Sequence, residues 1–170
     1  VSDSGRGTGA GPAPPDDDRY AVEVEVGRGG LGRVLRAQDK KLGRSIVLKQ
    51  LLHRSPDLEE RFEREARLSS RLEHPGIITV YDLVLDGDQP FYTMRMVSGR
   101  TLGELVRERQ TLVERLALLP NVLAVAEAVA YAHSKRILHR DIKPANILVG
   151  EFGETVLIDW GLAKFMDDPE

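Results

Sequence analysis

The chain lacks cysteine and any apolar run long enough to cross a membrane. The absence of cysteine excludes disulfides, thiolate metal sites and a cysteine nucleophile, and it is compatible with a reducing compartment. The longest apolar stretch, 116–132, is interrupted by Pro120 and Glu127 and falls short of the roughly 20 apolar residues of a membrane span. We therefore expect a buried helix there.

The sequence also lacks an excess of charge of either sign. Its 24 basic and 27 acidic side chains leave a net charge of −3, which argues against a nucleic-acid or membrane-surface partner. The opening stretch lacks the basic start and the apolar run that mark a secretory signal. We expect a cytoplasmic location for this segment, while a membrane tether elsewhere in a parent protein stays open.

The chain of 170 residues, 41% of them hydrophobic, can bury one core or two small ones. It begins at Val1 instead of Met, so we interpret it as an excerpt of a longer protein. Residues 1–19 are rich in Gly, Pro, Ser and Asp and have little to bury. We expect a disordered tail or linker there.

The first half of the remaining chain is expected to be strand-rich. Period-two alternation, glycine turns and an Asp86-Gly87-Asp88 connection mark the expected strands 22–26, 34–37, 45–51, 77–85 and 91–96. Ser55 and Pro56 make a good helix entrance, and the helix should run to about Leu72.

The second half changes in character. Thr101 and Glu104 form a capping box that predicts a short helix. A long helix is expected over 112–135, kinked or begun late because of Pro120. Short strands at 147–149 and 156–158 should flank a glycine turn.

Residues 27–34 carry glycines in the spacing GxGxxGxV. Glycines so placed let backbone N–H groups approach phosphate oxygens, although a plain glycine-rich hairpin turn explains the cluster equally well by itself. A dinucleotide-binding fingerprint requires a helix at the third glycine, where a strand is expected instead. The Walker form fails because no Gly-Lys-Ser/Thr follows. The remaining interpretation is a glycine flap between two antiparallel strands, of the kind that covers ATP.

Lys49 and Glu65 are charged residues in apolar surroundings. Lys49 ends an apolar strand, and Glu65 interrupts an apolar stripe of the expected helix. A buried carboxylate costs several kcal/mol unless it is paired, so the two residues are expected to pair. The alternative is that Glu65 lies at the edge of the stripe and pairs with Arg61 or Arg64 on the surface.

Residues 139–146 and 159–161, His-Arg-Asp-Ile-Lys-Pro-Ala-Asn and Asp-Trp-Gly, concentrate polar chemistry. Asp141 could accept a hydroxyl proton, and Lys143 could stabilise a transferring phosphoryl group. Asn146 and Asp159 offer oxygens for magnesium. A solvated loop could hold any one of them, and Asp159 alone could be a turn cap. The other histidines show no zinc-ligand spacing.

These motifs, in this order, resemble the eukaryotic-type (Hanks-type) protein kinase superfamily, and most of all its bacterial serine/threonine members, over about 20–164. The resemblance implies an α+β, two-lobe fold. The N-lobe and hinge would span 20–97, and 98–170 would be a partial C-lobe that stops shortly after the Asp-Trp-Gly motif.

The resemblance also implies a site for ATP and Mg²⁺ and a protein substrate bearing Ser or Thr. Asp141, Lys143, Lys49 and Glu65 would be catalytic, and His139 and Arg140 structural. Magnesium would be held by Asn146 and Asp159. The nucleotide-binding set would be Gly27, Arg28, Gly29, Gly30, Leu31, Gly32, Val34, Val47, Lys49, Met94, Met96 and Val97, with 94–97 as the hinge beside adenine.

The sequence departs from the family pattern at four positions of the expected site. Trp160 replaces a phenylalanine, Val47 an alanine, Leu31 an aromatic residue and Arg95 an acidic one, and none of these changes removes a catalytic group. We expect these residues alone to be inactive, because the segment that grips the substrate is absent. The alternative function is a pseudokinase-type binding module that does not transfer phosphate.

Overall fold

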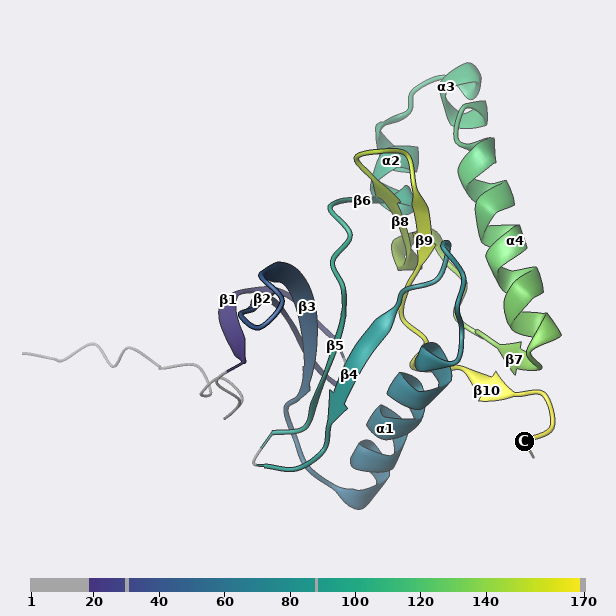
Figure 1. The fold of residues 1–170 in the computed structure, drawn as a ribbon. Helices are drawn as coiled ribbons and strands as arrows, with labels where there is room; N and C mark the ends of the chain where they lie inside the picture. The colour runs from purple at the N-terminus through teal and green to yellow at the C-terminus, as the bar shows by residue number, and fades with distance from the viewer. Residues whose placement is uncertain (1–18, 30, 88, 169–170) are drawn as a thin grey trace, which may run out of the picture.

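The computed structural model describes residues 19–168 except 30 and 88, so most of the expected tail lies outside the described residues. A five-stranded antiparallel sheet forms its N-terminal part (Figure 1). The strands are β1 (Tyr20–Arg28), β2 (Gly32–Asp39), β3 (Arg44–Leu51), β4 (Val80–Val84) and β5 (Phe91–Arg95), in the spatial order β1-β2-β3-β5-β4.

The alternation of side chains along β2 and β3 gives the sheet two different faces. Leu35, Ala37, Ile46 and Leu48 point to one face and are buried, where Phe91 joins them. We call this the inner face. The residues between them, such as Val34 and Lys49, point to the other face, which borders the cavity described below.

Helix α1 (Pro56–Ser70) packs beside the sheet (Figure 1). The hydroxyl of Ser55 accepts a hydrogen bond from Leu58 N at 3.3 Å, so the predicted cap is confirmed. Phe62 is completely buried and its ring lies 5.1 Å from that of Tyr92 on β5. The helix ends two residues before the expected Leu72.

The second half of the chain contains the remaining helices and two small sheets (Figure 1). The helices are α2 (Leu102–Glu108), α3 (Leu112–Leu116), α4 (Leu119–Ser134) and the short 3₁₀ helix η1 (Pro144–Asn146). The sheets are β6 (Gly99–Thr101), β8 (Ile147–Gly150) and β9 (Thr155–Leu157), and β7 (Ile137–Leu138) with β10 (Lys164–Phe165).

The expected long helix over 112–135 is divided into α3 and α4. Pro120 lies in the first turn of α4, where its missing N–H costs nothing, so the late start is confirmed. The capping box of Thr101 and Glu104 is also confirmed at the start of α2.

Helix α4 is apolar on more than one side. It buries Val125, Ala128 and Ala132, yet Val122 and Leu123 are 50% and 64% exposed. No helix in the part of the chain that the structure describes combines the length and apolarity needed to cross a bilayer.

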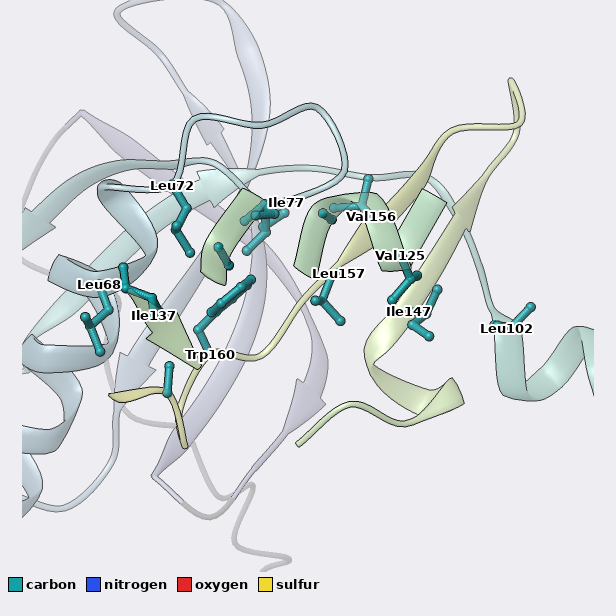
Figure 2. Close-up of a cluster of buried hydrophobic side chains, with 14 of the residues drawn as sticks. Leu68, Leu72, Ile77, Leu102, Val125, Ile137, Ile147, Val156, Leu157 and Trp160 are labelled. Carbon is teal, nitrogen blue, oxygen red and sulfur yellow. The ribbon is translucent and has the colours of Figure 1, made fainter. Parts of the chain in front are cut away.

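One hydrophobic cluster joins the two halves (Figure 2). Leu68 and Leu72 contribute from α1 and the residues after it, Val125 from α4, and Trp160 from the segment after β9. Trp160 is 1% exposed, so its large ring is part of the core. The position of this segment is therefore fixed by packing.

Two strand expectations need correction. Ile77 and Ile78 belong to no strand, although the run 77–85 is expected to be one; both are buried, and Ile77 forms a single parallel bridge to Leu157. Strands β6, β7 and β10 are not expected from the sequence, because two or three residues are too few for a visible alternation.

Candidate active site

A cavity of about 510 Å³ lies between the five-stranded sheet and the segment 145–160. Its volume is within the range of small-molecule sites. The described residues around it are Val26, Gly27, Arg28, Gly29, Val34, Val47, Lys49, Glu65, Ser69, Ile78, Val80, Tyr92, Met94, Arg95, Val97, Ala145, Asn146, Leu148, Ile158, Asp159 and Trp160.

The strand register explains why residues so far apart in the chain meet at the cavity. Gly27 is paired with Val34, Val34 with Lys49, and Lys49 with Tyr92, so these four residues form one row across the sheet. A second row, two residues before Lys49 on β3, pairs Val47 with Met94. Because side chains alternate with period two, both rows face the cavity.

The glycines of the flap differ in what surrounds them. A Cβ added to Gly29 would meet nothing within 4 Å, and one added to Gly27 would only touch Val34 at 3.9 Å. A Cβ added to Gly32 would lie 2.1 Å from the carbonyl oxygen of Gln50. Gly32 is therefore required by the packing of β2 on β3, whereas Gly27 and Gly29 leave open space beside the cavity.

The predicted pair of Lys49 and Glu65 is confirmed. Lys49 Nζ lies 2.6 Å from Glu65 Oε1, and the two side chains are only 12% and 2% exposed. The surface alternative with Arg61 or Arg64 is wrong, because Glu65 faces the core.

Tyr92 is a third member of this pair that the sequence analysis missed. Its hydroxyl donates to Glu65 Oε1 at 2.7 Å. Burial, together with the neighbouring Glu65 carboxylate, raises the pKa of Tyr92 well above its usual value, so the hydroxyl keeps its proton. The only signal in the sequence is its place opposite Lys49, which requires the register of β3 and β5.

Asp141, Lys143 and Asn146 form a hydrogen-bonded group in the loop after β7. Lys143 Nζ donates to Asp141 Oδ2 at 2.7 Å, and Asn146 Nδ2 donates to the same oxygen at 2.9 Å. The bond from Lys143, assisted by that from Asn146, lowers the pKa of Asp141, and Asp141 in turn raises the pKa of Lys143. At neutral pH the group is a carboxylate acceptor beside a cation.

Asn146 and Asp159 both border the cavity and carry side-chain oxygens that could hold a magnesium ion. Asn146 Nδ2 also donates to the backbone oxygen of Asp141 at 2.9 Å, so both amide hydrogens are used and the amide oxygen remains as a ligand. Asp159 Oδ1 lies 4.0 Å from Lys49 Nζ. Two oxygen ligands and an open cavity suit Mg²⁺, which keeps several of its own waters.

His139 and Trp160 hold this loop in place. The His139 ring lies 4.6 Å from that of Trp160. Its Nε2 is 3.0 Å from the backbone oxygen of Ile158, and its Nδ1 accepts from Asp141 N at 3.2 Å. Burial lowers the pKa of His139, so the neutral ring is favoured and links the start of the loop to the backbone that follows β9.

Not every residue of the expected catalytic and nucleotide-binding sets borders the cavity. Among the described residues, Leu31, Gly32, Met96, Asp141 and Lys143 are not part of its lining, and Gly30 lies outside the described residues. Leu31 instead packs against the cluster that contains Phe62. Asp141 is one side chain removed from the cavity, through its contact with Asn146.

The lining also includes residues that the sequence analysis did not single out. They are mainly apolar: Ile78, Val80, Leu148 and Ile158. Such residues carry no motif, because any buried segment contains similar ones. Their place in the lining depends on tertiary packing alone.

Comparison with known proteins gives the same family from two directions. The family model described as "Protein kinase domain" matches residues 20–170. The serine/threonine-protein kinase PknD of Protochlamydia amoebophila is 39% identical over 168 residues, which cover 91% of this chain and 17% of that protein. The PknD proteins of Chlamydia muridarum and Chlamydia pneumoniae are 41% and 38% identical, over 86% and 90% of this chain and 17% and 18% of their own lengths. The chain spans less than a fifth of these relatives, and it belongs to the protein kinase domain family.

Proposed function

We propose that this chain is the nucleotide-binding and catalytic-loop part of a kinase that transfers the γ-phosphoryl group of ATP to serine or threonine hydroxyls of proteins. The observation that carries the proposal is the convergence of Lys49, Asn146 and Asp159 on one cavity beneath a glycine flap. Membership of the protein kinase family supports the choice of ATP and magnesium. The names of the relatives support serine and threonine as acceptors.

In this proposal the strand-rich half binds and orients the nucleotide. The apolar side chains of Val34, Val47 and Met94 would surround the base, with the backbone of 94–97 beside its edge. Lys49, held by Glu65 at 2.6 Å, would place its charge on the phosphates. Because Glu65 is nearly inaccessible to water, the Lys49 side chain is positioned before the nucleotide arrives.

The catalytic-loop half would carry the chemistry of the acceptor. Asp141 is ionised at neutral pH and would accept the proton of the attacking hydroxyl. Lys143, 2.7 Å from it, would stabilise the transferring phosphoryl group. Asn146 and Asp159 would hold Mg²⁺, which when bound neutralises phosphate charge.

The division into lobes and the location belong to the same proposal. The five-stranded sheet with α1 would be the N-lobe, 20–97, and the residues from 98 onward part of the C-lobe. We place the segment in the cytoplasm, a location that the absence of cysteine supports. Its partner would be a protein substrate.

Radiolabelled ATP and a generic acceptor such as myelin basic protein test the proposal in the full-length protein. Transfer of label to serine or threonine, dependent on added Mg²⁺, is the expected result. Tight binding of ATP without any transfer would support the non-catalytic alternative. Absence of ATP binding would overturn both.

A further inference from the structure

Arg33 and Gln50 are two buried polar residues that the proposed chemistry leaves unused. They lie opposite each other on β2 and β3, and Arg33 Nε donates to Gln50 Oε1 at 2.8 Å. Arg33 is 7% exposed and Gln50 is completely buried. Both point to the inner face of the sheet, away from the cavity.

Each of the two residues is adjacent in sequence to a residue that borders the cavity on the opposite face of the sheet. Arg33 lies between Gly32, the last glycine of the flap, and Val34, which borders the cavity. Gln50 follows Lys49 directly. Since side chains alternate along a strand, a bond between Arg33 and Gln50 on the inner face fixes how Val34 and Lys49 stand on the cavity face.

The backbone around this pair is also closely fitted. The pairing of β2 with β3 runs without interruption from Gly32 opposite Leu51 to Asp39 opposite Arg44. The pairing of β1 with β2 has two register shifts, one of them between Glu25 and Gly27. The flap ends at β2, and β2 pairs regularly with β3, the strand that carries Lys49. The flap begins on β1, whose pairing with β2 is less regular.

Stability alone gives little reason for such a pair. A buried guanidinium is costly to remove from water, and apolar residues of similar size in its place often leave a protein as stable or more so. In addition, Gln50 Nε2 has no hydrogen-bond partner among the described residues, so the bond with Arg33 is made at the expense of a buried donor.

We propose that Arg33 and Gln50 are positioning residues that fix the C-terminal end of the glycine flap relative to Lys49, and so set the geometry in which ATP is bound. The inference rests on the proposed function, because it assumes that ATP occupies the cavity. It predicts that loss of the pair weakens the binding of ATP more than it slows the transfer of phosphate.

The test uses the full-length protein with Arg33→Met, which keeps the length of the side chain and removes the donor. We expect the KM for ATP to rise about tenfold while kcat changes less than about threefold, because loss of binding that is equal in the ground state and the transition state raises KM alone. Arg36→Met is the matched control: Arg36 is on the same strand, but it is exposed and pairs with Glu23 on the surface. It should leave both constants unchanged.

Two further variants separate positioning from folding. The double variant Arg33→Met, Gln50→Leu replaces the pair by an apolar one, so the unfolding midpoint should rise from that of Arg33→Met toward the wild-type value while the KM for ATP stays raised. Arg33→Lys keeps a donor in reach of Gln50 and should restore part of the affinity.

The outcomes distinguish the inference from the proposed function. If the wild-type protein does not bind ATP, the proposed function fails. If the wild-type binds ATP and Arg33→Met has a normal KM, or if the KM of the double variant returns to normal together with its stability, the positioning role is wrong and the pair is only part of the core.

Discussion

The two halves of the candidate active site hold ion pairs of nearly the same length in opposite surroundings. Lys49 Nζ and Glu65 Oε1 are 2.6 Å apart in side chains that are 12% and 2% exposed. Lys143 Nζ and Asp141 Oδ2 are 2.7 Å apart in side chains that are 51% and 26% exposed. Judged by distance alone, the two ion pairs would be equally strong. Burial makes the first a fixed part of the fold, whereas water competes for the second.

This difference matches the tasks that we propose for the two pairs. Lys49 has to meet every nucleotide in the same place, and a buried carboxylate holds it there. Asp141 has to exchange Lys143 for an incoming hydroxyl, and an exposed contact can be given up at little cost. The largest expected effect therefore concerns chemistry at the exposed pair, and the next concerns folding at the buried pair.

Asp141→Asn should have the largest effect. Removing the carboxylate that accepts the proton should lower the rate of phosphate transfer by about 10²- to 10⁴-fold. The affinity for ATP should hardly change, because Asp141 is not among the described residues that line the cavity. Single-turnover transfer and equilibrium ATP binding measure the two effects. Asp86→Asn, at an exposed turn, is the control, and an unaltered rate in Asp141→Asn would refute its role as base.

Glu65→Gln should have the next largest effect, on folding. It leaves Lys49 without its buried partner, which should cost about 3 kcal/mol of unfolding free energy in denaturant titrations. Lys143→Met removes a partner from the exposed pair and should leave the unfolding midpoint unchanged. Equal losses in the two variants would contradict the distinction between the pairs.

Gly32→Ala and Gly29→Ala sharpen the comparison within the strand-rich half. The new methyl group of Gly32→Ala would meet the Gln50 carbonyl, so we expect a loss of about 1–3 kcal/mol in unfolding free energy. That of Gly29→Ala has no neighbour within 4 Å, and its stability should stay close to wild type. Parallel thermal unfolding curves compare the two, and a larger loss for Gly29→Ala would contradict this assignment.

The smallest expected effect is a pH dependence at His139. Burial lowers its pKa in the folded state below the ordinary value of about 6.5, so the unfolded chain binds the proton more tightly. The stabilisation is complete above the unfolded pKa and is lost as the pH falls below it. His139→Phe keeps a ring beside Trp160 but cannot be protonated. Its unfolding midpoint should fall less than that of the wild type between pH 7.5 and 5.5, and parallel curves would refute the effect.

The sequence predicts those parts of the fold that local patterns determine. The strands of the sheet follow from alternation, and the starts of α1, α2 and α4 follow from Ser55, Thr101 and Pro120. The two- and three-residue strands β6, β7 and β10 could not be predicted, because they exist only where tertiary packing brings distant segments together.

The site divides in the same way. The pairing of Lys49 with Glu65 is predictable, since a charge within an apolar stripe requires a partner. The roles of Tyr92 and of Arg33 with Gln50 depend on which residues stand opposite each other in the sheet. No local pattern encodes the register of β3 on β5 across their long connection, and the short connection between β2 and β3 carries no turn motif that fixes their register. The exclusion of Leu31 from the cavity likewise depends on tertiary packing, which places it against the cluster that contains Phe62.

The backbone at Asp159 has a consequence for how its metal role can be tested. Its φ is 61°, in the left-handed region, which asparagine and aspartate tolerate better than other residues with a side chain. Alanine at this position would remove the carboxylate and also strain the backbone. A loss of magnesium affinity in that variant would therefore combine both effects. Asparagine tolerates the same backbone conformation and removes only the charge. The magnesium affinity of the Asp159→Asn variant can therefore be interpreted.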